Sequence, residues 1–208
     1  MKRILTASLL AVAMAAPLAA QAPKGWLERV DRSTSAADPD APGPIKFVAT
    51  GTSLHATNPQ AAVYWNPANT ITGNYSLKGT FVLQKPSSHS NYYGLVFGGS
   101  ALEGSSQEYL YFVVAQDGTW IVKQRQGDRD THVIARAANA AVNKPGADGK
   151  STNALEVRVG PDKVAFLVNG TTVHSAPKTD MLAKTNGIYG IRVNHMLEVR
   201  IDAFGATK

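Results

Sequence analysis

The stretch Asn153–Ser175, which reads NALEVRVGPDKVAFLVNGTTVHS, decides the fold. Apolar and charged side chains alternate from Leu155 to Val159, the period-two pattern of a half-buried strand. Gly160-Pro161-Asp162 then interrupts the run as a turn. A second apolar run over 164–168 ends at Asn169-Gly170, a dipeptide that favours a type I′ hairpin because both central residues need positive φ. We therefore predict an antiparallel meander of three short strands.

Similar runs fill the rest of the chain between Ile45 and Phe204, and glycine, proline and asparagine separate them. The pattern contains no amphipathic helix of useful length, and only Ala137–Val142 could form one helical turn. This arrangement predicts an all-β sandwich or barrel. The other predicted strands cover 45–49, 53–56, 62–65 (ended by Asn66-Pro67), 75–84, 92–98, 109–115, 120–125, 132–135, 188–193 and 197–204.

The N-terminus has the pattern of a secretory signal peptide. Lys2 and Arg3 precede an apolar run from Ile4 to Ala20, which is too short for a comfortable membrane span. Cleavage after Ala22 or after Ala20 would satisfy the preference for small residues. We expect residues 1–22 to be removed, leaving a mature form without a membrane span that is exported to the periplasm or the extracellular space.

A proline-rich segment follows the signal at 23–44, and we expect the β-domain to cover 45–208. Prolines in Asp38–Pro44 prevent a helix or an inner strand, so this segment is predicted to be a linker or lead-in that runs over the surface. Trp26 either pins the lead-in to the domain or is exposed for binding.

Composition excludes several classes of function. The sequence has no cysteine, which excludes disulfides and thiolate metal sites. Its 21 basic and 15 acidic residues are interspersed, which indicates a solvated surface and no nucleic-acid footprint. The five histidines form no H-x-H or H-E-x-x-H spacing, so we expect no zinc site and no cofactor. Nothing in the sequence supports a structural calcium ion, and the oligomeric state is open.

Asp117-Gly118 is a second hairpin signal. With a two-residue loop, Tyr109 and Tyr111 would share a face with Trp120 and Gln124. Tyr92–Gly98 is expected to pair alongside and to add Tyr92 and two glycines to that face, which would leave a shallow trough. Aromatic rings with amide donors suit sugars, which have apolar C–H faces and many hydroxyls. Alternatively, these aromatic residues pack under neighbouring loops.

The candidate site residues follow from this trough. Glu108, His89 and Arg125 are the candidates for catalysis, with Glu108 as the plausible groove acid and His89 at the rim. The candidate ligand-binding residues are Tyr92, Tyr109, Tyr111, Trp120, Gln124, Arg192, Asn194 and His195.

The order of the segments NYSLKGTFVLQK, SNYYGLVFGG, EYLYFVVAQDGTW, NALEVRVGPDKVAFLVNGTTVH and GIYGIRVNHMLEVRIDAF resembles the concanavalin A-like lectin/glucanase superfamily. The similarity covers 45–204 and is strongest to its laminin-G-like branch and to bacterial domains named 3-keto-disaccharide hydrolase. The resemblance implies a two-sheet antiparallel jelly-roll sandwich whose concave sheet binds carbohydrate. The E-x-D-x-x-E strand of family-16-type glucanases does not occur in this sequence.

Three functions remain as alternatives. The first is an exported carbohydrate-binding protein with an aromatic concave face, whose partner is a carbohydrate or a cell-envelope glycan. The second is a glycoside-processing hydrolase of the 3-keto-disaccharide hydrolase type. The third is a non-catalytic interaction domain of the cell envelope. Since glycoside hydrolysis normally needs paired carboxylates, the missing motif favours a protein that is not an enzyme.

Overall fold

The computed structural model describes residues 23–33, 36 and 38–208, so the predicted signal peptide lies outside the described residues. The described residues form fourteen β-strands and one short 3₁₀ helix, Asp180–Ala183. Among these residues, no helix has the length and apolar character needed to cross a membrane. The strands are β1 (Leu27–Asp31), β2 (Lys46–Thr50), β3 (Ser53–Asn58), β4 (Ala61–Ile71), β5 (Tyr75–Lys85), β6 (Tyr92–Ser100), β7 (Glu108–Ala115), β8 (Thr119–Gln126), β9 (Arg129–Ala138), β10 (Ser151–Val159), β11 (Lys163–Val168), β12 (Thr171–Pro177), β13 (Gly187–Val193) and β14 (Leu197–Thr207).

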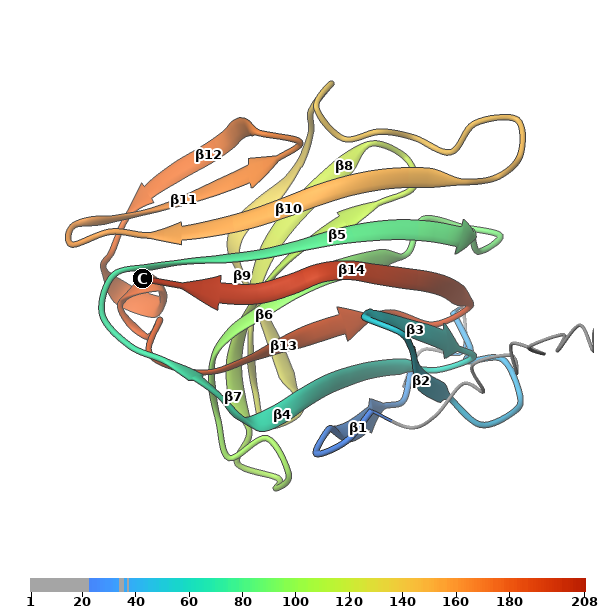
Figure 1. Ribbon diagram of the computed structural model, residues 1–208, viewed down its shortest axis with the longest axis horizontal. Helices are drawn as coiled ribbons and strands as arrows, with labels where there is room; N and C mark the ends of the chain where they lie inside the picture. The colour runs from blue at the N-terminus through green and yellow to red at the C-terminus, as the bar shows by residue number, and fades with distance from the viewer. Residues whose placement is uncertain (1–22, 34–35, 37) are drawn as a thin grey trace, which may run out of the picture.

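The strands form two seven-stranded antiparallel sheets that pack into a jelly-roll sandwich, as predicted. One sheet has the order β1-β4-β13-β6-β7-β8-β9, and the other has the order β12-β11-β10-β5-β14-β3-β2. Figure 1 shows β5, β10 and β14 of the second sheet crossing in front of β6 to β9 of the first. We call the first sheet the site sheet, because its outer face carries the candidate site.

The core lies between the two sheets. Along β5, Leu77, Phe81 and Leu83 are fully buried, whereas Lys78, Thr80 and Val82 on the other face are more exposed. Leu95 and Phe97 of β6 contribute to the same core from the site sheet, as the alternation in the sequence predicts. A buried side chain of this size contributes about 1.5–3 kcal/mol, so these core residues from the two sheets supply much of the stability that disulfides provide in many small secreted proteins.

The meander at Asn153–Ser175 is confirmed. Strand β10 pairs with β11, which in turn pairs with β12. Asn169 and Gly170 have φ values of 51° and 80°, as a type I′ turn requires. The Asn169 side chain also accepts a hydrogen bond from the Ala154 amide at 2.8 Å, which ties the turn to β10.

The lead-in contributes a strand to the sandwich, which the expected domain start at Ile45 did not include. Strand β1 pairs with β4 at the edge of the site sheet, from Leu27↔Trp65 to Asp31↔Ala61. Trp26 pins this segment: its ring packs 5.2 Å from that of Phe47 and 5.7 Å from that of Phe204. The prolines follow β1, so they leave its hydrogen bonds intact.

Two local predictions were wrong. Strand β4 does not end at Asn66-Pro67 but continues to Ile71, because its pairing with β13 skips these residues at a bulge and resumes at Thr70. The segment Ala137–Val142 contains the end of β9 and a turn, with no helix.

The β7–β8 hairpin also differs from the prediction, by one residue in register. Val114 lies opposite Trp120 and Tyr109 lies opposite Arg125, which leaves a loop of three residues, Gln116–Gly118. Gly118 adopts φ 87°, which is typical of the left-handed position that ends a three-residue loop. Because side chains alternate between faces, this shift moves every β8 side chain to the opposite face from the predicted one.

Candidate functional site

The outer face of the site sheet has two hollows, and Asn194 lines both. The first, which we call the polar hollow, has a volume of about 350 Å³. The second, the aromatic hollow, has a volume of about 200 Å³. Beneath them lies a small apolar cluster of the site sheet, separate from the main core, that includes Trp65, Val96, Tyr109, Tyr111 and Ile121.

The strand register explains how charged residues gather in the polar hollow. Tyr109 of β7, Arg125 of β8 and Asp130 of β9 lie opposite one another in one row across the sheet. Asp31 comes from the edge strand β1 at the other side, and Arg192 comes from β13 between them. Five strands thus bring these side chains to one face.

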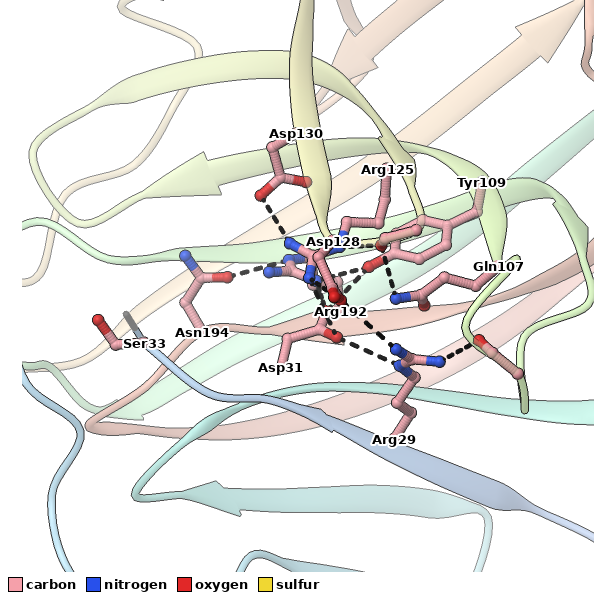
Figure 2. A network of polar contacts seen from close by, with 12 residues as sticks. Arg29, Asp31, Ser33, Gln107, Tyr109, Arg125, Asp128, Asp130, Arg192 and Asn194 are labelled. Carbon is pink, nitrogen blue, oxygen red and sulfur yellow. Dashed lines mark hydrogen bonds and ion pairs between the residues drawn. The ribbon is translucent and has the colours of Figure 1, made fainter. Parts of the chain in front are cut away.

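Asp31 is at the centre of the resulting network, which Figure 2 shows from close by. Its Oδ2 lies 2.5 Å from Nη1 of Arg192 and accepts a hydrogen bond from the Tyr109 hydroxyl at 3.1 Å. Its Oδ1 lies 3.5 Å from Nε of Arg29 and 3.8 Å from Nη2 of Arg125. The carboxylate is therefore held by three guanidinium groups and one phenol.

These contacts keep Asp31 ionised although it is buried. Burial by itself would raise the pKa of Asp31, but the charges of Arg192 and Arg125 and the hydrogen bonds from Arg192 and Tyr109 outweigh it, so the net pKa is lowered. Burial raises the pKa of Tyr109 well above its usual value, so this phenol stays protonated and remains a donor. The network is pre-organised before any ligand arrives.

Arg192 joins the network to both hollows. Its Nη1 donates to the Tyr109 hydroxyl at 2.6 Å, and its Nε donates to Oδ1 of Asn194 at 3.2 Å. Its guanidinium carbon lies 4.9 Å from the centre of the Tyr111 ring, within the range of a cation–π contact. Arg125 is held on the other side by Asp130 at 3.2 Å and Asp128 at 3.5 Å.

The aromatic hollow has a different lining. Tyr92 and Tyr111 lie beside Val113 and Ile121, and longer polar side chains close the rim. Of the two tyrosines, Tyr92 is the more exposed, while Tyr111 is buried beneath Arg192. The polar lining residues are Lys123, His132, Arg136 and Asn194.

The structure brings together most of the predicted ligand-binding residues. Tyr92 and Tyr111 line the aromatic hollow, and Arg192 and His195 line the polar hollow with Asn194 between them. Tyr109 lies directly below, where its hydroxyl supports Asp31 and Arg192.

The predicted positions of Trp120 and Gln124 were wrong. Trp120 is 3% exposed and packs in the main core, where its ring lies 6.2 Å from that of Phe112. Gln124 is also buried on the inner side, opposite Leu110. The three-residue loop explains both errors, because the shifted register turns these side chains inward and turns Arg125 outward.

The three catalytic candidates are separated. Glu108 lies outside both hollows, and its Oε1 contacts Gln124 at 2.8 Å and Lys184 at 2.6 Å. The expectation that Glu108 is the groove acid was therefore wrong. Arg125 lines the polar hollow, whereas His89 lies in the β5–β6 loop against His195.

Sequence reasoning missed three of the five carboxylates of the polar hollow. These are Asp31, Asp38 and Asp40 of the lead-in; Asp128 of the β8–β9 turn and Asp130 of β9 were expected to lie in a charged loop that could approach a groove, and both line the hollow. The segment LERVD has no clear period-two alternation, because Glu28 and Arg29 are adjacent, so it carried little signal for a strand.

Three other hollows are larger, at about 550, 560 and 450 Å³, and the third lies beside the β7–β8 loop at Asp117 and Gly118. The first is lined by Trp26 and Trp65, and the second by the lead-in from Ala41 to Pro44. None of the three is lined by the network of buried charges around Asp31, so we place the candidate site at the polar and aromatic hollows.

Neither a family model nor a curated protein matches the sequence. Solved structures do match. The carbohydrate-binding module CBM66 from Bacillus subtilis is 8% identical, with a TM-score of 0.60 over 88% of this chain and 96% of that one. The endo-β-1,3-glucanase from Pyrococcus furiosus is 9% identical, with a TM-score of 0.59 over 90% of each chain. The potassium-bound carbohydrate recognition domain of Emp46p is 11% identical, with a TM-score of 0.54 over 88% of each chain.

These likenesses confirm the concanavalin A-like fold that the sequence resembles. At such low identity they show the fold alone. The narrower resemblance to laminin-G-like and 3-keto-disaccharide hydrolase domains stays a prediction.

Proposed function

We propose that the protein binds a neutral carbohydrate across the polar and aromatic hollows, with Asn194 between its two contact regions. The observation that carries the proposal is the pairing of a pre-organised charged hollow with an aromatic one on the same sheet face. The fold neighbours include a carbohydrate-binding module and a carbohydrate recognition domain, which supports the same class of ligand.

The charge of the polar hollow favours a neutral ligand. Five carboxylates line it against three guanidinium groups, so an anionic ligand would meet net repulsion. Neighbouring hydroxyls of a sugar can donate to a carboxylate and accept from a guanidinium at the same time. In the adjacent aromatic hollow, Tyr92 and Ile121 provide an apolar surface for the C–H face of a sugar ring.

The arrangement favours binding over hydrolysis. A glycosidase needs one carboxyl group that stays protonated near neutral pH as a general acid. Asp31, the buried carboxyl group of the network, has a lowered pKa and is committed to Arg192 and Tyr109. We further propose, from the signal-like N-terminus, that the protein is exported and meets its glycan in the periplasm or outside the cell.

The experiment is a glycan-array screen of the mature protein, followed by titration with the best ligand. Tyr92→Ala should weaken binding by about tenfold through loss of the aromatic contact. Tyr189→Ala is the matched control, because Tyr189 is also partly buried but lines neither hollow and packs against Phe204. Equal binding by wild type and Tyr92→Ala would overturn the location of the site, and failure of the wild type on a broad array would overturn the proposal.

A further inference from the structure

Three segments that are far apart in the sequence bring two histidines and a carboxylate to one point. Asp38 comes from the lead-in, His89 from the β5–β6 loop and His195 from the β13–β14 turn. The Nε2 atoms of the two histidines lie 3.3 Å apart. Oδ1 of Asp38 lies 2.7 Å from Nε2 of His89 and 3.2 Å from Nε2 of His195.

A neighbouring hydrogen bond places a lone pair on the nitrogen of His195 that faces Asp38 and His89. Oδ1 of Asp40 lies 3.0 Å from Nδ1 of His195, and because a carboxylate accepts, this nitrogen carries the proton and Nε2 is left bare in the neutral ring. Nδ2 of Asn91 donates to the His195 carbonyl at 3.0 Å, which fixes its amide as a donor, and it also lies 3.1 Å from Nε2 of His89.

Oδ1 of Asp38 and the bare Nε2 of His195 are acceptors, so a shared proton or a metal ion must lie between them and Nε2 of His89, and three potential ligand atoms this close together can hold a metal ion. Four ligands at about 2.0–2.1 Å in a tetrahedron stand about 3.3 Å apart, close to the separations of these three atoms. The carboxylate of Asp40 on the far nitrogen of His195 is the outer-shell partner that metal-binding histidines characteristically have.

We propose that Asp38, His89 and His195 bind a divalent transition-metal ion, with Zn²⁺ the preferred ion and Asp40 as the positioning residue. Two imidazoles and one carboxylate form a donor set typical of zinc, and three protein ligands leave a fourth position open. Spacing within the sequence did not reveal this site, because each ligand comes from a different loop.

The site would have two effects on the molecule. A metal ion would fasten the lead-in to two loops of the sandwich, in a chain without disulfides. Asp38 and His195 also line the polar hollow, so the ion would lie in its wall. The metal proposal does not depend on the carbohydrate proposal, since either ligand can be titrated without the other.

The test uses the mature protein without an affinity tag, stripped with a chelator and titrated with Zn²⁺ by calorimetry. We expect saturable binding of one ion per chain, a higher melting temperature in the presence of Zn²⁺, and visible absorption bands of tetrahedral cobalt when Co²⁺ replaces it. His89→Ala is the main variant, because this side chain is 41% exposed and its loss leaves the core intact.

His89→Ala should lose more affinity than the roughly 10–100-fold typical of an outer-shell partner, and Asp40→Asn should fall in that range. His55→Ala is the matched control, because His55 lies on β3 of the opposite sheet and should leave the affinity unchanged. Absence of Zn²⁺ binding by the wild type, or equal affinity in His89→Ala and wild type, would overturn the proposal. Asp38→Asn provides a second ligand variant should His89→Ala fold poorly.

Discussion

Asp31 and Arg192 lie 161 residues apart in the chain, yet Oδ2 of Asp31 is 2.5 Å from Nη1 of Arg192. Both side chains are almost fully buried, with exposed fractions of 3% and 6%. The pair joins the edge strand β1 to β13 at the middle of the site sheet, and Tyr109 bonds to both partners. The stability of the sheet and the shape of the polar hollow therefore depend on the same contact.

Asp31→Asn should lower the free energy of unfolding by about 3–5 kcal/mol, because it leaves Arg192 buried without its anion. Urea unfolding at neutral pH measures this loss. The matched control is Asp128→Asn, whose side chain is 91% exposed and should change stability by less than about 0.5 kcal/mol. Equal stability of the two variants would show that the pair contributes nothing.

The contribution of Asp31 should depend on pH in acid. Its folded pKa is below the ordinary value of 3.8, so the unfolded chain binds more protons as the pH falls. The stabilisation is thus fully present above the ordinary pKa and is lost as the pH falls through the lowered folded value. Urea unfolding of wild type and Asp31→Asn should give a constant difference above about pH 5 that narrows below it. A difference that is unchanged into strong acid would contradict the lowered pKa.

Trp120→Ala should destabilise the protein by about 3–5 kcal/mol, because the indole is 3% exposed and packs beside Phe112 in the main core. Thermal unfolding should show a much larger decrease in melting temperature for Trp120→Ala than for Tyr92→Ala, because the Tyr92 ring is more exposed. The reverse order would instead support the hairpin register expected from a two-residue loop.

Gly190→Ala should destabilise the protein by about 1–3 kcal/mol, because an added Cβ would collide with the carbonyl oxygen of Tyr64 on the neighbouring strand. This close approach lies beside the bulge between β13 and β4. Gly205→Ala is the control, since a Cβ there meets no atom within 4 Å. Calorimetric melting of both variants measures the difference, and equal melting temperatures would contradict the tight packing at Gly190.

Much of the fold could be predicted because its signals are local. The alternation along Leu155–Val159 and the Asn169-Gly170 turn specify strands and a hairpin from a few residues. The segment Tyr92–Gly98 was placed correctly against β7, with Leu95 facing the core, for the same reason.

The candidate site was predicted only in part, because its geometry depends on register and on distant partners. The choice between a two-residue and a three-residue loop at Asp117-Gly118 decided whether Trp120 or Arg125 faces the hollows, and both loops suit that dipeptide. Asp31 was missed because proline-rich sequence follows it closely, although β1 itself precedes the prolines.

The sequence by itself determined the all-β class, most of the strands and most turns, because alternating burial and turn preferences depend on residues that are close together in the chain. Only the tertiary structure decided which side chains meet. The ion pair of Asp31 with Arg192 and the cluster of Asp38, His89 and His195 join segments that the packing of two sheets brings together. No local pattern in the sequence encodes such contacts, since each of these residues is of a type that occurs commonly in strands or loops without such a partner.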